Sequence, residues 1–199
     1  MRRTTGRGPR AGVVLPIRSF LLGKARLASV LDDGARADLG RRLAARVVDA
    51  AGELPVVVVT SAPEVDAWAT ARGCTVLADP GSLDGAAARG VEHLRAADVV
   101  RALVVHADLP RAKSFGRLLD DGDRPIVALV PCHRDDGTNV LSLPVGSPFG
   151  FAYGPGSFRR HAAEARRLGL PVRVVRDPDL AFDVDVPDDL AALDDPLGA

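Results

Sequence analysis

The feature that most constrains this chain is the alternation of short β-branched runs with longer stretches of helical period. Residues 54–60 contain four consecutive valines, a pattern typical of a strand that is buried on both faces. Residues 33–51 instead repeat Leu39, Leu43 and Val47 at four-residue spacing, which predicts a helix with one apolar face. Strands and helices that alternate in this way predict a mostly parallel sheet covered by helices on both sides.

The same patterns predict strands at residues 13–16, 76–78, 102–106, 126–131, 140–143, 172–175 and 182–186, helices at 64–72, 84–96 and 157–168, and a helical turn from Pro187. A chain of 199 residues without an internal repeat, a low-complexity block or a linker is expected to form one domain. We therefore expect a flexible basic tail over residues 1–10 and a single α/β three-layer sandwich over residues 11–199.

Composition excludes several classes of function. Lys and Arg number 26, as do Asp and Glu, and this balance argues against a strongly basic nucleic-acid-binding surface. No apolar run approaches the roughly 20 residues of a membrane span, and the arginine-rich start is not followed by the apolar part of a signal peptide. Two cysteines cannot build a disulfide framework. We expect a cytoplasmic protein without a nucleic-acid or membrane partner, and the composition leaves the oligomeric state open.

Carboxylates stand at the ends of two predicted strands. Asp108 follows one apolar run by two residues, and Asp183 and Asp185 form an Asp-x-Asp pair on the last predicted strand. Parallel strands deliver such residues to a common crevice, where ligands bind. Two carboxylates on one strand face, roughly 6 to 7 Å apart, repel each other unless a cation lies between them, and oxygen ligands favour Mg²⁺ or Mn²⁺. These three residues are therefore candidate ligands for a divalent ion that bridges a polyphosphate; the alternative is an exposed strand face.

Two loops have the composition of anion sites. Gly-Pro-Gly-Ser at residues 154–157 immediately precedes a predicted helix, and such a turn can offer unpaired N–H groups to an anion. Arg18, Lys24 and Arg26 follow the first strand without a nearby carboxylate, which suits a triphosphate. Lys24 is one of only two lysines among 26 basic residues. The alternatives are a plain capped turn and a solvated basic loop.

Six motifs occur in a fixed order along residues 12–190. They are Pro-x-Arg-Ser…Gly-Lys-Ala-Arg-Leu at 16–27, Asp-Pro-Gly-Ser-Leu-Asp at 79–84, Ala-Asp-Leu-Pro at 107–110, Asp-Asp-Gly-Thr-Asn-Val-Leu at 135–141, Tyr-Gly-Pro-Gly-Ser-Phe at 153–158 and Phe-Asp-Val-Asp-Val-Pro-Asp-Asp-Leu at 182–190. Together they resemble the 2-phospho-L-lactate and phosphoenolpyruvate guanylyltransferases of coenzyme F-420 biosynthesis. The resemblance implies a nucleotidyltransferase fold of the glycosyltransferase-A-like type, and transfer of GMP from GTP to a small phospho-acid with release of diphosphate.

The resemblance also implies roles for individual residues. It assigns Mg²⁺, with two ions plausible, to Asp108, Asp183 and Asp185, which would be catalytic together with Lys24. It assigns the phospho-acid to Thr138, Gly154 and Ser157, and the nucleotide to Arg18, Lys24, Arg26 and Asp84. The chain departs from the family pattern at Arg18, where lysine is usual, at Asp84, where asparagine is usual, and in the basic segment at residues 111–113.

An acceptor phosphate is already ionised, so this reaction needs positioning and charge stabilisation rather than a general base. His106, beside the acidic strand end, is accordingly expected to be structural. Two other readings remain: a nucleotide-sugar glycosyltransferase of the same fold type, and a non-catalytic GTP-binding sensor. The resemblance leaves three acceptors open, phosphoenolpyruvate, 2-phospho-L-lactate and 3-phospho-D-glycerate. The composition is typical of a GC-rich bacterium, and the bacterial branch of the resembled family mostly resembles the phosphoenolpyruvate type, so the resemblance favours that acceptor. The preference for guanine rests on the resemblance alone.

Overall fold

A seven-stranded sheet in the order β3-β2-β1-β4-β6-β5-β7 organises the computed structural model, which describes residues 10–119 and 124–193. The strands are β1 (Ala11–Pro16), β2 (Val56–Val59), β3 (Thr75–Leu77), β4 (Arg101–Val105), β5 (Val127–Pro131), β6 (Thr138–Pro144) and β7 (Val172–Val174). The helices are η1 (Ala25–Leu27), α1 (Asp33–Ala50), α2 (Pro63–Ala71), α3 (Leu83–Ala96), η2 (Gly116–Leu118), α4 (Ser157–Arg167), α5 (Pro178–Ala181) and α6 (Pro187–Ala191).

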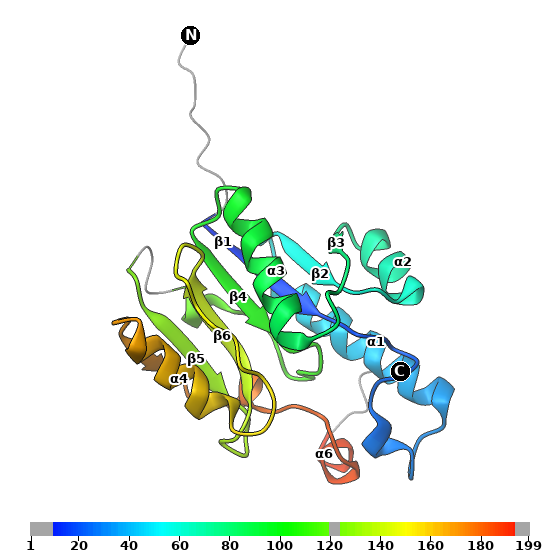
Figure 1. Ribbon diagram of the computed structural model, residues 1–199. Helices are drawn as coiled ribbons and strands as arrows, with labels where there is room; N and C mark the ends of the chain where they lie inside the picture. The colour runs from blue at the N-terminus through cyan, green and yellow to red at the C-terminus, as the bar shows by residue number, and fades with distance from the viewer. Residues whose placement is uncertain (1–9, 120–123, 194–199) are drawn as a thin grey trace.

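Helices cover the sheet on both faces (Figure 1). Apolar residues of α3 and α4 pack on one face of the sheet, and those of α1, α2 and α5 pack on the other. The contact between α3 and β1 is especially close, because a Cβ at Gly90 would come within 2.2 Å of Val14 Cγ1. The predicted α/β class, with three layers and a mostly parallel sheet, is confirmed.

The antiparallel strand β6 decides where the site is built. All pairings of β6 are antiparallel, whereas the other recorded pairings are parallel. Val140 near the start of β6 therefore lies opposite Val105 at the end of β4, and the His106 N–H donates to the Asn139 carbonyl at 3.0 Å. The start of β6 thus meets the carboxyl ends of β1 and β4 at one edge of the sheet.

The strand predicted at residues 182–186 is wrong, because the segment is irregular between α5 and α6. Its backbone N–H groups find partners outside any ladder: Val184 donates to the Asp108 carbonyl at 3.2 Å, and Asp185 donates to the Asp189 carboxylate. Its apolar residue Val184 joins a small cluster with Leu27, Leu39 and Leu43. The alternating apolar residues arise because one side of this irregular segment is buried, and not because the segment is a β-strand.

The other predicted elements are present with ends shifted by a few residues, and the short helices η1, η2 and α5 were not predicted. The basic tail predicted at residues 1–10 lies outside the described residues except for Arg10, which is exposed. The single domain predicted over residues 11–199 likewise extends beyond them at residues 120–123 and 194–199. Within the described ranges, no helix is both long enough and apolar enough to cross a membrane.

Candidate active site

Two adjoining cavities open at the carboxyl ends of β1, β2 and β4, where ligands bind in sheets of this kind. The first, of about 270 Å³, is lined by residues that include Arg18, Lys24, His106, Asp108 and Asp185. The second, of about 300 Å³, lies at the start of α3 and shares Arg18 with the first. The structure therefore brings the loop after β1 into one crevice with Asp108 and Asp185.

Lys24 forms the centre of this crevice. The residue adopts a left-handed backbone conformation with φ of 56° ahead of η1, and its ammonium lies 2.5 Å from Asp108 Oδ2 and 3.4 Å from Asp185 Oδ1. Burial disfavours the charged form of Lys24, but the two carboxylates outweigh it and raise the pKa of Lys24. Burial likewise opposes the charged form of Asp108, yet Lys24 holds the pKa of Asp108 below its ordinary value. Both groups are therefore ionised at neutral pH.

Asp183 is buried beside this pair. Its Oδ1 lies 3.2 Å from His133 Nδ1 and 3.4 Å from Asn139 Nδ2. Asn139 also donates to the carbonyls of Leu180 and Ala181, so its amide fixes the end of α5 next to Asp183. Burial, and then the negative charges of Asp108 and Asp185, raise the pKa of Asp183. The three carboxylates are close enough to repel one another.

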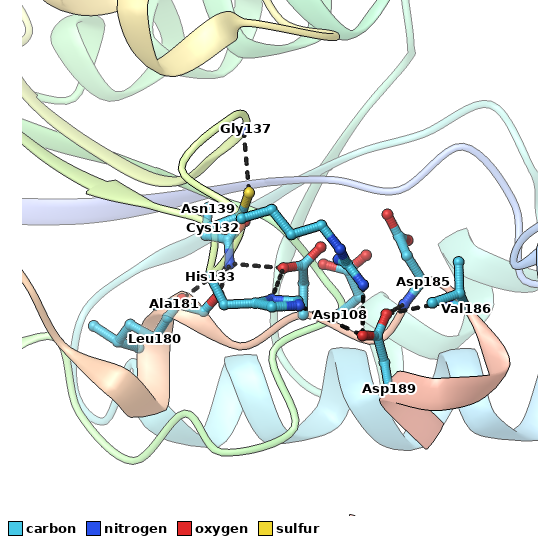
Figure 2. Close-up of polar contacts among 12 residues, drawn as sticks. Asp108, Cys132, His133, Gly137, Asn139, Leu180, Ala181, Asp185, Val186 and Asp189 are labelled. Carbon is cyan, nitrogen blue, oxygen red and sulfur yellow. Dashed lines mark hydrogen bonds and ion pairs between the residues drawn. The ribbon is translucent and has the colours of Figure 1, made fainter. Parts of the chain in front are cut away.

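The Asp-x-Asp segment is held by Asp189, a residue that sequence reasoning missed. Asp189 Oδ2 accepts from the backbone N–H groups of Asp185 at 2.8 Å and Val186 at 3.0 Å (Figure 2). Its Oδ1 accepts from the Arg134 guanidinium at 2.6 Å. Burial opposes the charge of Asp189, but these donors lower its pKa. An acidic residue two positions after Pro187 is a helix-start pattern that could have indicated this role.

The carboxylates suit a hard cation by their chemistry. Asp108 Oδ1 is buried and has no hydrogen-bond partner, and two further carboxylates lie beside it. Oxygen donors of this kind are those that Mg²⁺ prefers. In this conformation the cation between Asp108 and Asp185 is Lys24, and across the described residues no three His, Cys, Asp or Glu side chains are arranged to hold a metal. The carboxylate oxygens fit a divalent ion by their chemistry. In this conformation the Lys24 ammonium balances the negative charge of Asp108 and Asp185.

The other predicted cations lie around this centre. Arg18 is exposed and lines both cavities. Arg26 is exposed, with NH1 4.0 Å from Asp185 Oδ2. Asp84, predicted to contact the nucleotide, accepts a hydrogen bond through Oδ1 from the Tyr153 backbone N–H at 2.7 Å. It therefore connects the start of α3 to the glycine-rich turn that precedes α4.

The glycine-rich turn before α4 makes more hydrogen bonds to the chain's own side chains than its sequence indicates. Gly154 and Gly156 have φ values of 99° and 73°, which favour glycine. The Gly156 N–H already donates to Asp136 Oδ1 at 2.9 Å, and the Arg160 guanidinium donates to the carbonyls of Ala152 and Tyr153. The turn's shape is therefore fixed by the chain's own carboxylate and guanidinium groups.

Thr138 and Ser157 meet beneath this turn. Ser157 Oγ lies 3.5 Å from Thr138 Oγ1, which is also 3.0 Å from His161 Nδ1. His161 Nε2 accepts from the Ala152 N–H at 3.1 Å, so the proton of the neutral ring is on Nδ1. Burial lowers the pKa of His161 to about 4, which keeps the ring neutral. The structure thus brings together Thr138, Gly154 and Ser157, with both hydroxyls buried.

Comparison with known families decides the relationship. A family model described as "Guanylyl transferase CofC like" matches residues 11–193. The chain belongs to this guanylyl transferase family. A phosphoenolpyruvate guanylyltransferase from Sphaerobacter thermophilus is 37% identical over 90% of this chain and 90% of its own length. One from Chloroflexus aggregans is 34% identical over 87% and 92%, and a 3-phospho-D-glycerate guanylyltransferase from Phenylobacterium zucineum is 33% identical over 90% and 87%.

Solved structures share the fold of this family member. A nucleotidyl transferase from Methanothermobacter superposes with a TM-score of 0.63 at 16% identity, covering 92% of this chain and 95% of that one. Glucosyl-3-phosphoglycerate synthase from Mycobacterium tuberculosis, in complex with Mg²⁺ and uridine diphosphate, superposes with a TM-score of 0.52 at 18% identity, covering 85% and 69%. Such a divalent ion is therefore found with a nucleotide in one protein of this fold.

Proposed function

We propose that this protein transfers GMP from GTP to phosphoenolpyruvate, with release of diphosphate, in coenzyme F-420 biosynthesis. The observation that carries the proposal is the junction of Lys24, Asp108 and Asp185 between a cavity at α3 and the turn before α4. The names of the relatives support both the reaction and the acceptor. The Phenylobacterium relative makes 3-phospho-D-glycerate the second acceptor to test.

The order of strands along the sheet edge suggests how the substrates lie. The cavity at β2 and α3 would take the nucleoside of GTP, and Arg18, Lys24 and Arg26 would face its triphosphate. Thr138, Gly154 and Ser157 lie on the other side of Asp108, at β6 and the start of α4. We place the phospho-acid there, so the two substrates would meet over Asp108.

The reaction forms a bond between an acceptor phosphate oxygen and the α-phosphorus of GTP. The bond from that phosphorus to the bridging oxygen breaks, and diphosphate leaves with the electron pair. Lys24 and the two arginines would bind the leaving diphosphate, while the turn orients the acceptor for in-line attack. Asp108, Asp183 and Asp185 would hold Mg²⁺, which when bound reduces the repulsion between the two anionic substrates.

The test is diphosphate release from GTP with Mg²⁺ and each of three acceptors: phosphoenolpyruvate, 2-phospho-L-lactate and 3-phospho-D-glycerate. Parallel reactions contain ATP in place of GTP, or a chelator in place of the metal. The proposal predicts release with GTP, phosphoenolpyruvate and metal together. Absence of diphosphate release with all three acceptors would overturn the proposal. Turnover of a nucleotide sugar by the same protein would then support sugar transfer.

A further inference from the structure

The Lys24 ammonium lies between two of the candidate metal ligands. Its nitrogen is 2.5 Å from Asp108 Oδ2 and 3.4 Å from Asp185 Oδ1. A Mg²⁺ ion lies about 2.0–2.1 Å from each of its oxygen ligands, so an ion bound by these two oxygens would take nearly the position of the ammonium nitrogen. Two cations so close repel each other strongly in a crevice that water screens only weakly. Lys24 and a metal ion therefore exclude each other from this position.

The other oxygens of the two carboxylates do not form an alternative metal position in this conformation. Asp108 Oδ1 is buried and has no hydrogen-bond partner, but it is a single oxygen. Asp185 Oδ2 lies 4.0 Å from a second cation, Arg26. Within residues 10–119 and 124–193, no three acidic, His or Cys side chains are arranged to hold a metal. An ion that uses Asp108 and Asp185 together has to displace Lys24.

The loop that carries Lys24 is only lightly packed. Leu21 and Leu22, earlier in the same loop, are 54% and 77% exposed. Lys24 follows Gly23 and has a left-handed φ of 56°, which is uncommon for lysine. Its four-carbon stem is flexible, so the ammonium can turn away from Asp108 without a change in the backbone.

The first cavity gives the ammonium another anion to bind. Lys24 and Arg18 both line this cavity of about 270 Å³, where we place the triphosphate of GTP. Phosphate oxygens compete with carboxylates for an ammonium group. A bound nucleotide would therefore free Asp108 and Asp185 and at the same time add its own oxygens as metal ligands.

We propose that Lys24 competes with divalent ions for Asp108 and Asp185, so that the metal enters the crevice only when a nucleotide draws the ammonium away. This inference rests on the proposed function and deepens it, because it makes the metal and GTP bind cooperatively. Such coupling is reciprocal, so the metal strengthens nucleotide binding by the same factor.

Removal of the ammonium tests the competition directly. Lys24→Met and Lys24→Gln are titrated with Mn²⁺ without nucleotide, and free Mn²⁺ is measured by electron paramagnetic resonance. We expect the Kd for Mn²⁺ in both variants to fall at least about 10-fold below that of the wild type, because the two carboxylates are left without their cation. Mn²⁺ should also raise the Tm of each variant by more than it raises that of the wild type, which requires a folded protein.

A fluorescent GTP analogue tests the coupling. The ratio of its Kd without Mg²⁺ to its Kd with Mg²⁺ should be at least about 10-fold smaller in Lys24→Met than in the wild type, because Lys24 no longer has to be displaced. An equal ratio in the two proteins would contradict the coupling.

Lys113→Met removes the other lysine of the chain, which is 77% exposed, and its Kd for Mn²⁺ should stay within about two-fold of the wild type. The double variant Lys24→Met/Asp108→Asn should lose the gain in affinity, because the ion then lacks one carboxylate. Equal Kd values in the wild type and both Lys24 variants, or a gain that survives Asp108→Asn, would overturn the inference. Failure of the wild type to release diphosphate with any phospho-acid would instead overturn the proposed function, and the Mn²⁺ titrations distinguish the two failures.

Discussion

At the scale of single residues, Lys24 bears the most charge interactions in the crevice. Its side chain is 13% exposed and that of Asp108 is 19% exposed, so solvent screens the pair only weakly. Removal of one partner from such a pair leaves an uncompensated charge. The rarity of lysine in an arginine-rich chain was the sequence signal for this position.

Lys24→Met is accordingly expected to lower the free energy of unfolding by about 3 kcal/mol and guanylyl transfer by about 100-fold or more. Lys113→Met is the matched control, because this other lysine is 77% exposed and its ion pair with Asp179 contributes at most about 1 kcal/mol. Urea unfolding and diphosphate release measure the two effects. Equal stability losses in both variants would contradict the account of Lys24.

The buried His161 predicts a pH dependence of stability. Its pKa is about 4 in the fold, below the ordinary 6.5, so the unfolded chain takes up a proton first as pH falls. Its contribution is complete above pH 6.5 and is lost between pH 6.5 and 4, by about 2 kcal/mol at pH 5. Urea unfolding at pH 7 and pH 5 should show a smaller difference for His161→Asn than for the wild type. An unchanged difference would show that His161 does not titrate in this way.

Sequence patterns located the acidic and basic residues of the crevice better than the groups that hold them. Asp108 could be found because it ends an apolar run, whereas His133 and Asn139 act through Asp183, some 50 and 44 residues away. Such contacts depend on how β6 and α5 come together, which a local pattern does not record. Asp183 and Asp185 were singled out for a strand geometry that they do not have.

At the scale of elements, the segment between α5 and α6 is held by a side chain in the first turn of α6 and not by the hydrogen bonds of a strand. Asp189 at the third position of α6 binds two N–H groups of that segment and is 4% exposed. The position of Asp185 in the crevice therefore depends on α6.

Asp189→Ala should lower the free energy of unfolding by about 1–2 kcal/mol, as for loss of a helix cap. It should also lower the transfer rate of the protein that remains folded, because Asp185 is no longer held in position. Asp188→Ala, at the neighbouring exposed position, is the control and should change neither. Thermal unfolding and diphosphate release at a temperature where both variants are folded separate the two effects. A wild-type rate in Asp189→Ala would show that α6 does not position the carboxylates.

At the scale of the whole molecule, the sheet order explains why one edge collects every candidate site residue. The strand periodicity predicted a mostly parallel sheet correctly, because buried parallel strands have unbroken apolar runs. It did not predict that β6 runs antiparallel, since Val-Leu-Ser-Leu at residues 140–143 is mostly apolar, as the two strands beside it are. Yet this reversal is what brings Thr138 and Asn139 to the edge occupied by Lys24 and Asp108.

The most direct test of the account is ³¹P NMR of a reaction that contains the protein, GTP, phosphoenolpyruvate and Mg²⁺. Transfer at the Asp108 junction predicts coupled resonances of a new mixed diphosphate together with free diphosphate, and their loss in Asp108→Asn. Formation of GDP and inorganic phosphate instead, or equal product from Asp108→Asn, would contradict it.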